Sequence, residues 1–165
     1  MMESRIIHPL APIYDNESRV LVLGSMPSPI SRSKSFYYAN PQNRFWRVLA
    51  AVFECEIGVS NDERTAFLLA NHIALWDVLY SCEITGARDE SIKNPVANDI
   101  KSVVDNSKIT AIFTTGSKAG QLYSKLCAKN VKIDETRLPS TSPANCRYYS
   151  FEDLVRHYQI IRQCI

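Results

Sequence analysis

The sequence lacks the features of a membrane protein, a metalloprotein and a disulfide-stabilised secreted domain. No apolar run approaches the ~18 residues of a membrane-spanning helix, and residues 1–19 lack the basic-then-apolar pattern of a secretory signal. Five cysteines and three histidines are scattered, without a CxxC pair or the spacing of metal ligands. We therefore expect a cytoplasmic protein with reduced thiols, no membrane partner, no metal and no cofactor.

Acidic residues are absent from residues 19–53, although the net charge of the whole chain is only +2. The basic residues of that stretch are Arg19, Arg32, Lys34, Arg44 and Arg47. Such a segment is either an ordinary solvated face or an edge that contacts phosphate groups, because backbone charge supplies much of the affinity for nucleic acids. The charge distribution alone leaves both interpretations open.

Several catalytic motifs are also missing. GSMPSPIS, at residues 24–31, matches neither the P-loop pattern nor GxGxxG, and the loop at residues 115–120 is too short before its lysine to enclose phosphates. There is no GxSxG elbow, and the spacing of the histidines gives no support to a Ser/His/Asp hydrolase. The common nucleotide-binding and hydrolase classes are therefore disfavoured.

The size and the hydrophobic pattern predict one α/β domain over residues 1–165. Apolar runs predict strands at residues 19–24, 73–79, 110–116 and 131–138. Helices are expected from Asn40, as N-cap with Pro41 first, and over about 61–71, 95–104, 117–128 and 151–161. Because strands separated by helices pair in parallel, we predict a three-layer α/β/α sandwich with a central, mainly parallel four-stranded sheet.

Two polar, proline-containing segments follow strands of this predicted sheet. Residues 24–28 come after the first strand, and residues 138–145 come after the fourth. Ligands of such sheets bind beyond the carboxyl ends of the strands. We therefore expect these two segments to meet at one site.

The motifs in these segments resemble those of the uracil-DNA glycosylase superfamily. GSMPSPISRSKSFYYANPQNRFW, at residues 24–46, is similar to the first motif of the mismatch-specific branch, which runs GINPG and then FAHPANRFW, without a gap over 23 positions. LPSTSPAN, at residues 138–145, occupies the place of the second motif, HPSPLS or LPNPSG in other branches. With ALWDVLYSCE at residues 74–83 and the stretch 93–99, the chain most resembles the hypoxanthine-DNA (deoxyinosine) glycosylase family.

The resemblance implies a monofunctional, metal-free DNA glycosylase that flips a deaminated base out of DNA and hydrolyses its glycosidic bond in base excision repair. Hypoxanthine is the expected base, DNA the expected partner and a monomer the expected state. A uracil or mismatch-specific glycosylase, a non-catalytic module that binds damaged DNA, and an enzyme of free nucleosides are the alternatives.

Three residues carry the expected chemistry. Asn43 matches the asparagine implicated in catalysis in the hypoxanthine family, and we expect its carbonyl oxygen to orient the attacking water, since an amide is too weak a base to remove a proton. Tyr38 matches the aromatic residue on which the flipped base stacks. Asp77 lies where relatives have an asparagine at the base edge, and it is expected to accept from a ring N–H. The structural alternatives are a helix cap for Asn43, a core tyrosine for Tyr38 and a turn or helix cap for Asp77.

The sequence departs from its relatives at three positions. One of them, Asn40 in place of His, is structurally tolerable because Asn is a good N-cap. Met26 stands where the better-known branches have a catalytic Asp or Asn, and Leu138 stands where their second motif opens with His. Both losses argue against efficient uracil excision. They fit the hypoxanthine branch, in which the acid of the first motif is also missing.

The remaining candidates surround these positions. Backbone amides of the 26–28 loop are expected to meet a base carbonyl, and the segment from Asn145 to Tyr148 is a candidate for insertion into the duplex, with a plain surface loop as its alternative. The base-binding candidates are Met26, Pro27, Ser28, Tyr38, Phe45 and Asp77. The DNA-binding candidates are Arg44, Ser140, Thr141, Ser142, Asn145 and Arg147.

Overall fold

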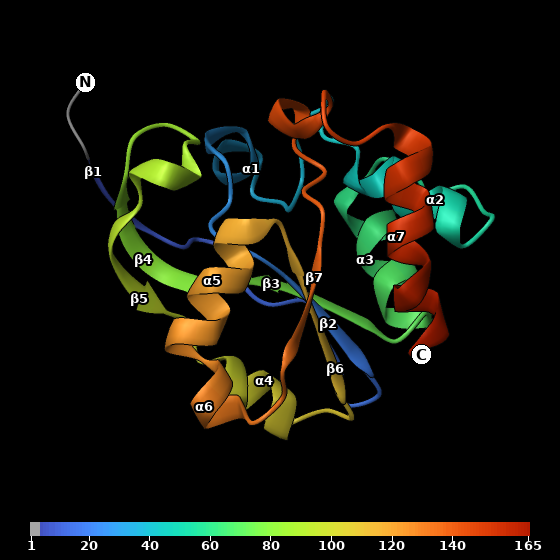
Figure 1. The fold of residues 1–165 in the computed structure, drawn as a ribbon. Coiled ribbons are helices and arrows are strands. Elements are labelled where there is room, and N and C mark those ends of the chain that lie inside the picture. Colours follow the sequence, from blue (N-terminus) through green and yellow to red (C-terminus); the bar gives the residue numbers. More distant parts are fainter. Residues whose placement is uncertain (1–3) are drawn as a thin grey trace.

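Four parallel strands form the central sheet of the computed structural model, which describes residues 4–165 (Figure 1). They lie in the order β3-β2-β6-β7, and each neighbouring pair is parallel. The strands are β2 (Val20–Gly24), β3 (Ile73–Asp77), β6 (Ala111–Thr115) and β7 (Glu135–Leu138). The predicted four-stranded parallel sheet is therefore confirmed.

Helices cover both faces of this sheet (Figure 1). Val20 and Val22 of β2 pack in the hydrophobic cluster that includes α2 and α7, whereas Leu21 and Leu23 pack in the cluster that includes α4 and α5. Successive side chains of a strand point to opposite faces, so a strand covered on both sides is apolar throughout. One set of helices is α2 (Phe45–Val52), α3 (Asn61–Ala70) and α7 (Phe151–Gln163). The other set is α4 (Ile100–Asp105), α5 (Ser117–Leu126) and α6 (Ala128–Val131).

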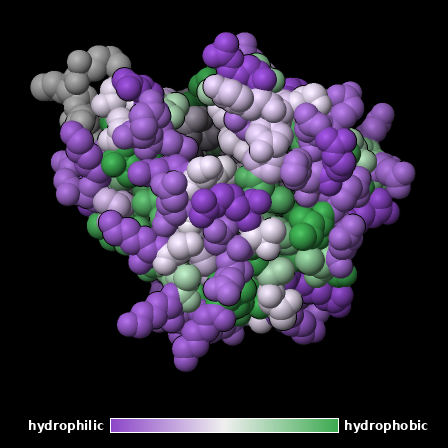
Figure 2. Space-filling model, in the orientation of Figure 1, coloured by the Kyte–Doolittle hydropathy of each residue, from purple (hydrophilic) through white to green (hydrophobic). Residues whose placement is uncertain are grey.

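The outer surfaces of the helices are mostly polar. In the view of Figure 2, hydrophilic residues cover most of the face shown, and hydrophobic residues form only separate patches among them. Helices α3 and α7 begin where predicted, because Ser60 with Glu63 and Ser150 with Asp153 form capping boxes. None of the helices in residues 4–165 has the length and apolar character needed to cross a membrane.

A second, antiparallel sheet was not predicted. It has the order β1-β4-β5 and consists of β1 (Ser4–Ile7), β4 (Leu79–Ile84) and β5 (Lys93–Ala97). The predicted strand 73–79 divides at Val78, and the predicted helix 95–104 is wrong in its first half. Pro95 lies in the edge strand β5, where a missing N–H is tolerated, and Asp99 then caps α4 by accepting from Ser102 N.

Two further boundaries differ from the prediction. Of the predicted strand 131–138 only Glu135–Leu138 is extended, because α6 continues to Val131. Residues 29–34, for which no helix is predicted, form the short helix α1 (Pro29–Lys34), with Ser28 as its N-cap. Two short 3-10 helices complete the chain, η1 (Asp89–Ser91) and η2 (Pro143–Asn145).

The helix expected to start at Asn40 begins later, at Phe45. The side-chain oxygen of Asn40 accepts from Gln42 N at 3.0 Å, and Asn43 N donates to the carbonyl of Asn40 at 2.9 Å. Asn40 and Pro41 therefore form a turn before the helix, because an Asn side chain that binds the backbone two residues on stabilises a turn as well as a cap. Asn43 accordingly precedes the first turn of α2 instead of lying in it.

Asn98 joins the two sheets beside the carboxyl end of β3. Its buried Nδ2 donates to the carbonyls of Asp77 at 2.9 Å and Leu79 at 3.0 Å, and its N–H donates to the carbonyl of Val78 at 2.8 Å. Because these carbonyls flank the point where the chain leaves one sheet for the other, Asn98 fixes the end of β3 on which Asp77 stands.

Replacing Asn98 with Ala is expected to lower the free energy of unfolding by about 2 kcal/mol or more, since two buried carbonyls lose their donor. Urea denaturation of both proteins measures the difference. The exposed Asn130→Ala is the matched control and is expected to stay within about 0.5 kcal/mol. Equal effects of the two substitutions would contradict the role given to Asn98.

Candidate active site

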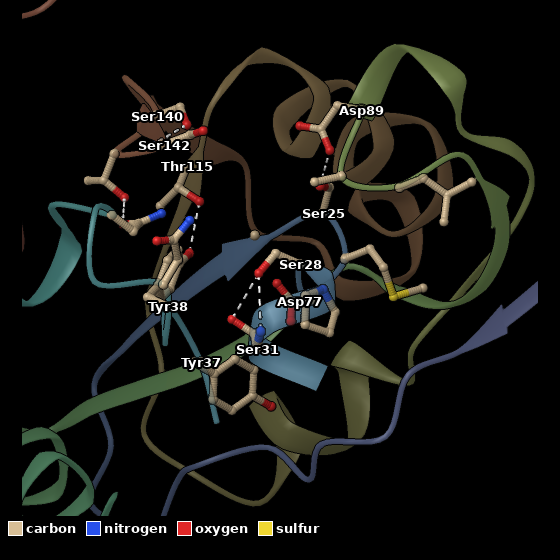
Figure 3. A pocket seen from close by; sticks show the side chains of 18 residues that line it. Ser25, Ser28, Ser31, Tyr37, Tyr38, Asp77, Asp89, Thr115, Ser140 and Ser142 are labelled. Carbon is tan, nitrogen blue, oxygen red and sulfur yellow. Dashed lines mark hydrogen bonds between the residues drawn. The ribbon is translucent and has the colours of Figure 1, made fainter. Parts of the chain in front are cut away.

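A pocket of about 140 Å³ lies beyond the carboxyl ends of the parallel strands (Figure 3). Each strand contributes a residue at or just after its end: Gly24 from β2, Asp77 from β3, Thr115 from β6 and Ser140 after β7. The two segments expected to meet, residues 24–28 and 138–145, both line it. The pocket therefore occupies the position at which α/β sheets bind ligands.

Tyr38 forms one side of this pocket and is supported from behind by Phe45. The two rings are stacked with centroids 3.9 Å apart at 14°, and the Tyr38 hydroxyl bonds Thr115 Oγ1 at 3.0 Å. Burial, with a smaller contribution from the charge of Asp77, raises the pKa of the Tyr38 phenol, which therefore stays neutral. Phe45 is 0% exposed and does not line the pocket, so its position does not support the predicted contact with a base.

The side chain of Asn43 links the two motif segments. Its Oδ1 accepts from Phe45 N at 3.0 Å and from Thr141 Oγ1 at 2.8 Å. An amide oxygen has two lone pairs, so these donors fill it, and the predicted use of this oxygen to orient water is not supported. Asn43 lines the pocket, and its Nδ2 has no hydrogen-bond partner within residues 4–165. The free group of Asn43 is therefore a donor.

The second motif segment satisfies most of its own polar groups. Thr141 is 1% exposed and gives its hydroxyl proton to Asn43, while Ser142 N donates to Ser140 Oγ at 3.1 Å. Asn145 Nδ2 donates to the carbonyl of Ser140 at 2.9 Å. Ser140, Thr141 and Ser142 line the pocket, and within the described residues the hydroxyl protons of Ser140 and Ser142 have no acceptor. The predicted phosphate contact is therefore disfavoured only for the hydroxyl of Thr141 and stays a prediction for the two serines.

The two predicted DNA-binding arginines lie in different surroundings. Arg44 is turned inward: one guanidinium nitrogen donates to the carbonyl of Tyr149 at 2.7 Å, and its buried Nε and second terminal nitrogen have no partner within the described residues. This conformation does not support the predicted phosphate contact. Arg147 is exposed, next to Tyr148, which is 71% exposed. Because Asn145 is tied to Ser140, the exposed part of the predicted insertion segment is Arg147 and Tyr148.

The loop of the first motif closes the other side of the pocket. Met26, Pro27 and Ser28 all line it, as predicted, and Met26 is 9% exposed. Ser28 also accepts from Ser31 N at 3.2 Å as the N-cap of α1. Met26 therefore places an apolar side chain where the other branches have the catalytic acid.

Sequence reasoning missed two residues that complete the site. The imidazole of His8 is paired with Asp77, and the carboxylate of Asp89, on η1, accepts from Ser25 Oγ at 2.9 Å at the rim of the pocket (Figure 3). Desolvation by the surrounding protein raises the pKa of the Asp89 carboxyl, although the bond from Ser25 opposes the shift. Neither residue belongs to a motif, so no signal in the sequence marks them.

The fold and the pocket together define an α/β protein with a small polar and aromatic binding site at the strand ends. The sequence profile of the Uracil DNA glycosylase superfamily matches residues 11–163, and the chain therefore belongs to that superfamily. The resemblance found in its motifs is thereby confirmed, as is the prediction that the protein is a DNA glycosylase.

Two named relatives come from the genus Methanosarcina. The chain is 33% identical over 138 residues to a Hypoxanthine DNA glycosylase of Methanosarcina acetivorans, covering 82% of this chain and 86% of the relative. It is 33% identical over 141 residues to a Hypoxanthine DNA glycosylase of Methanosarcina barkeri, with the same coverage of 82% and 86%. A solution NMR structure of a candidate uracil DNA glycosylase from Methanosarcina acetivorans superposes with a TM-score of 0.78 at 28% identity, covering 92% of this chain and 96% of that one.

The carboxyl of Asp89 is expected to titrate above the ordinary Asp range, and in Ser25→Ala its pKa is expected to rise further because the opposing hydrogen bond is lost. Carboxyl ¹³C NMR titration measures both values. Asp153 is the internal control, since the capping bonds from Ser150 lower its pKa. A carboxyl with a raised native pKa contributes stability that is present at low pH and falls as the pH rises through that pKa. An Asp89 value at or below that of Asp153 would contradict the assignment.

Proposed function

We propose that the protein excises hypoxanthine from DNA containing deoxyinosine by hydrolysing the glycosidic bond, which leaves an abasic site. The observation that carries the proposal is the combination, in one pocket, of an aromatic face, a free amide donor and a carboxylate acceptor, from Tyr38, Asn43 and Asp77. Hypoxanthine presents a matching edge, with N1–H as donor and O6 and N7 as acceptors. The names of the Methanosarcina relatives support the same base.

The flipped base stacks on the face of Tyr38 that Phe45 does not cover. The hydroxyl bond to Thr115 and the stacked Phe45 hold the Tyr38 ring in place before a base arrives. Tyr38 adopts a φ of 50°, a left-handed conformation that costs on the order of 1 kcal/mol for a residue with a side chain. We infer that this unfavourable backbone conformation is what directs the Tyr38 ring into the pocket.

The protein promotes cleavage of the glycosidic bond by stabilising the opposite charges that develop on the base and the sugar. As the glycosidic bond lengthens, negative charge develops on the base and positive charge on the deoxyribose. Water adds to C1′ of the deoxyribose, and the proton that this water releases passes to the departing base, so that free hypoxanthine and an abasic site are the products. The Nδ2 group of Asn43 donates to an acceptor atom of the departing base, which stabilises the negative charge. The carboxylate of Asp89 supplies negative charge to the pocket at a site where Met26 supplies none, and so favours the positive sugar.

Single-turnover assays on duplexes that carry one deoxyinosine, deoxyuridine or deoxyxanthosine test the proposal. We expect release from deoxyinosine to be fastest, and we expect strand cleavage only after alkali, because Lys34, the lysine of the first motif, does not line the pocket. An undamaged duplex is the control. Tight binding without release would identify a damaged-DNA-binding module instead, and release from free deoxyinosine alone would identify a nucleoside enzyme. Either result would overturn the proposal.

Asn43→Ala is expected to lower the single-turnover rate on deoxyinosine by ~10² or more, the usual effect of removing a donor to a developing charge. Asn43→Asp is the sharper variant, because its carboxylate still accepts from Phe45 N and Thr141 while the donor is lost. We expect Asn43→Asp to fold like the native protein and to be slow. A rate within about twofold of the native value would show that Asn43 is structural.

Tyr38→Ala is expected to weaken capture of the flipped base by ~1–3 kcal/mol, from lost stacking. The apparent Kd comes from the dependence of the single-turnover rate on enzyme concentration. Tyr38→Phe keeps the ring and loses only the bond to Thr115, so its effect should be under ~1 kcal/mol. Equal losses of affinity in Tyr38→Ala and Tyr38→Phe would mean that the hydroxyl, and not the ring, captures the base.

We further propose that the chain is one domain that acts as a cytoplasmic monomer. The separate hydrophobic patches on the face shown in Figure 2 support a monomer, since permanent interfaces are continuous and apolar. Sedimentation velocity at micromolar concentration is the test of the monomer.

A further inference from the structure

A buried histidine–aspartate pair lies beside the pocket. His8 Nε2 and Asp77 Oδ2 are 2.7 Å apart, and their side chains are 1% and 6% exposed. His8 follows β1, the first strand of the antiparallel sheet, and its backbone N–H donates to the carbonyl of Tyr80 at 2.7 Å. The pair thus joins the small sheet to the carboxyl end of β3, far from either motif segment along the chain.

Hydrogen bonding fixes the proton on the His8 ring. Leu10 N donates to Nδ1 at 3.1 Å, so this nitrogen carries a lone pair. The proton of the neutral imidazole is therefore on Nε2 and is donated to the carboxylate of Asp77. The ring also packs between Trp76 and Tyr37, with centroids 6.3 Å and 6.2 Å away, so it has little freedom to turn.

The second oxygen of Asp77 is the one left for a ligand. A Cβ built on Gly24 would lie 2.5 Å from Asp77 Oδ1, so the carboxylate packs directly against this glycine. Asp77 lines the pocket, and Oδ1 has no hydrogen-bond donor within the described residues. Because His8 occupies Oδ2 and Asn98 holds the backbone carbonyl, the carboxylate has one orientation and one free acceptor.

We propose that His8 is a positioning residue that holds the carboxylate of Asp77 in one orientation and directs Oδ1 to the edge of the bound base, so that the pair selects bases with a ring N–H. This inference rests on the proposed function and deepens it. Hypoxanthine carries a proton at N1, where adenine, its parent base, has a lone pair. A carboxylate in a fixed orientation attracts the N1 proton of hypoxanthine and repels the N1 lone pair of adenine. It therefore discriminates the deaminated base from the normal one.

Few other groups face the carboxylate. The charge of Asp77 acts on the hydroxyls of Tyr37 and Tyr38 and on Asp89. The Tyr37 hydroxyl donates to the carbonyl of Ala11, the Tyr38 hydroxyl bonds Thr115, and Asp89 is itself acidic. None of these groups replaces the donor of His8. Without the donor of His8, Oδ2 loses the contact that orients the carboxylate, and Oδ1 is no longer directed at N1–H.

Two variants of His8 separate positioning from packing. His8→Phe keeps a ring beside Trp76 and removes the donor, whereas His8→Gln restores an N–H at a similar reach. At pH 7 we expect the single-turnover rate of His8→Phe on deoxyinosine to fall by ~10-fold or more, because the carboxylate is no longer held toward the base. His8→Gln should stay within ~3-fold of the native rate, because its N–H restores the donor.

A rate of His8→Phe within ~3-fold of the native value, or an equal loss of rate in His8→Phe and His8→Gln, would overturn the inference. Long-range ¹H–¹⁵N NMR of the native protein gives an independent test, even if His8→Phe fails to fold. It should show the Nε2–H form of His8 at pH 7, and the Nδ1–H form would refute the assignment. Failure of the proposed function is distinct, because the native protein itself would then release no base from deoxyinosine.

Discussion

One side-chain oxygen, Oδ1 of Asn43, holds the site together. It accepts from the first N–H of α2 and from the hydroxyl of Thr141, and so ties the helix of the first motif to the loop of the second. The same two bonds leave Nδ2 as the free group of the side chain. They also fix the start of α2, where Phe45 supports Tyr38. The aromatic face and the free donor of the pocket therefore both depend on this oxygen.

The carboxylates of the pocket come from outside the motif segments. Asp77 stands at the end of β3 with the donor of His8, and Asp89 is on η1 with the hydroxyl of Ser25. Each carboxylate accepts from one side-chain donor, Asp77 from His8 Nε2 and Asp89 from Ser25 Oγ. The pocket therefore contains two carboxylates, although Met26 replaces the acid that other branches carry in the first motif.

The sequence predicted the elements whose formation depends on local signals. Apolar strands such as Val20–Gly24 are unambiguous because both faces are covered, and α3 and α7 are marked by capping boxes. The antiparallel sheet was not predicted because Lys93–Ala97 contains Pro95 and its apolar and polar residues do not alternate regularly. Pairing with β4 gives this segment its strand structure. In the sequence Asn40 fits a helix cap as well as a turn, because both structures use the same bond from the asparagine side chain to the backbone.

By itself the sequence determined that residues 24–28 and 138–145 lie at one edge of the sheet, because parallel strands end together and each segment follows a strand. The resemblance to the glycosylase motifs then assigned Tyr38, Asn43 and Asp77 to the same site. Tertiary structure decided what each group does there. It turned Arg44 inward to Tyr149, used the oxygen of Asn43, and brought His8 to Asp77 and Asp89 to Ser25. The physical reason is that buried polar groups must find partners, and most of these partners come from segments distant in the chain.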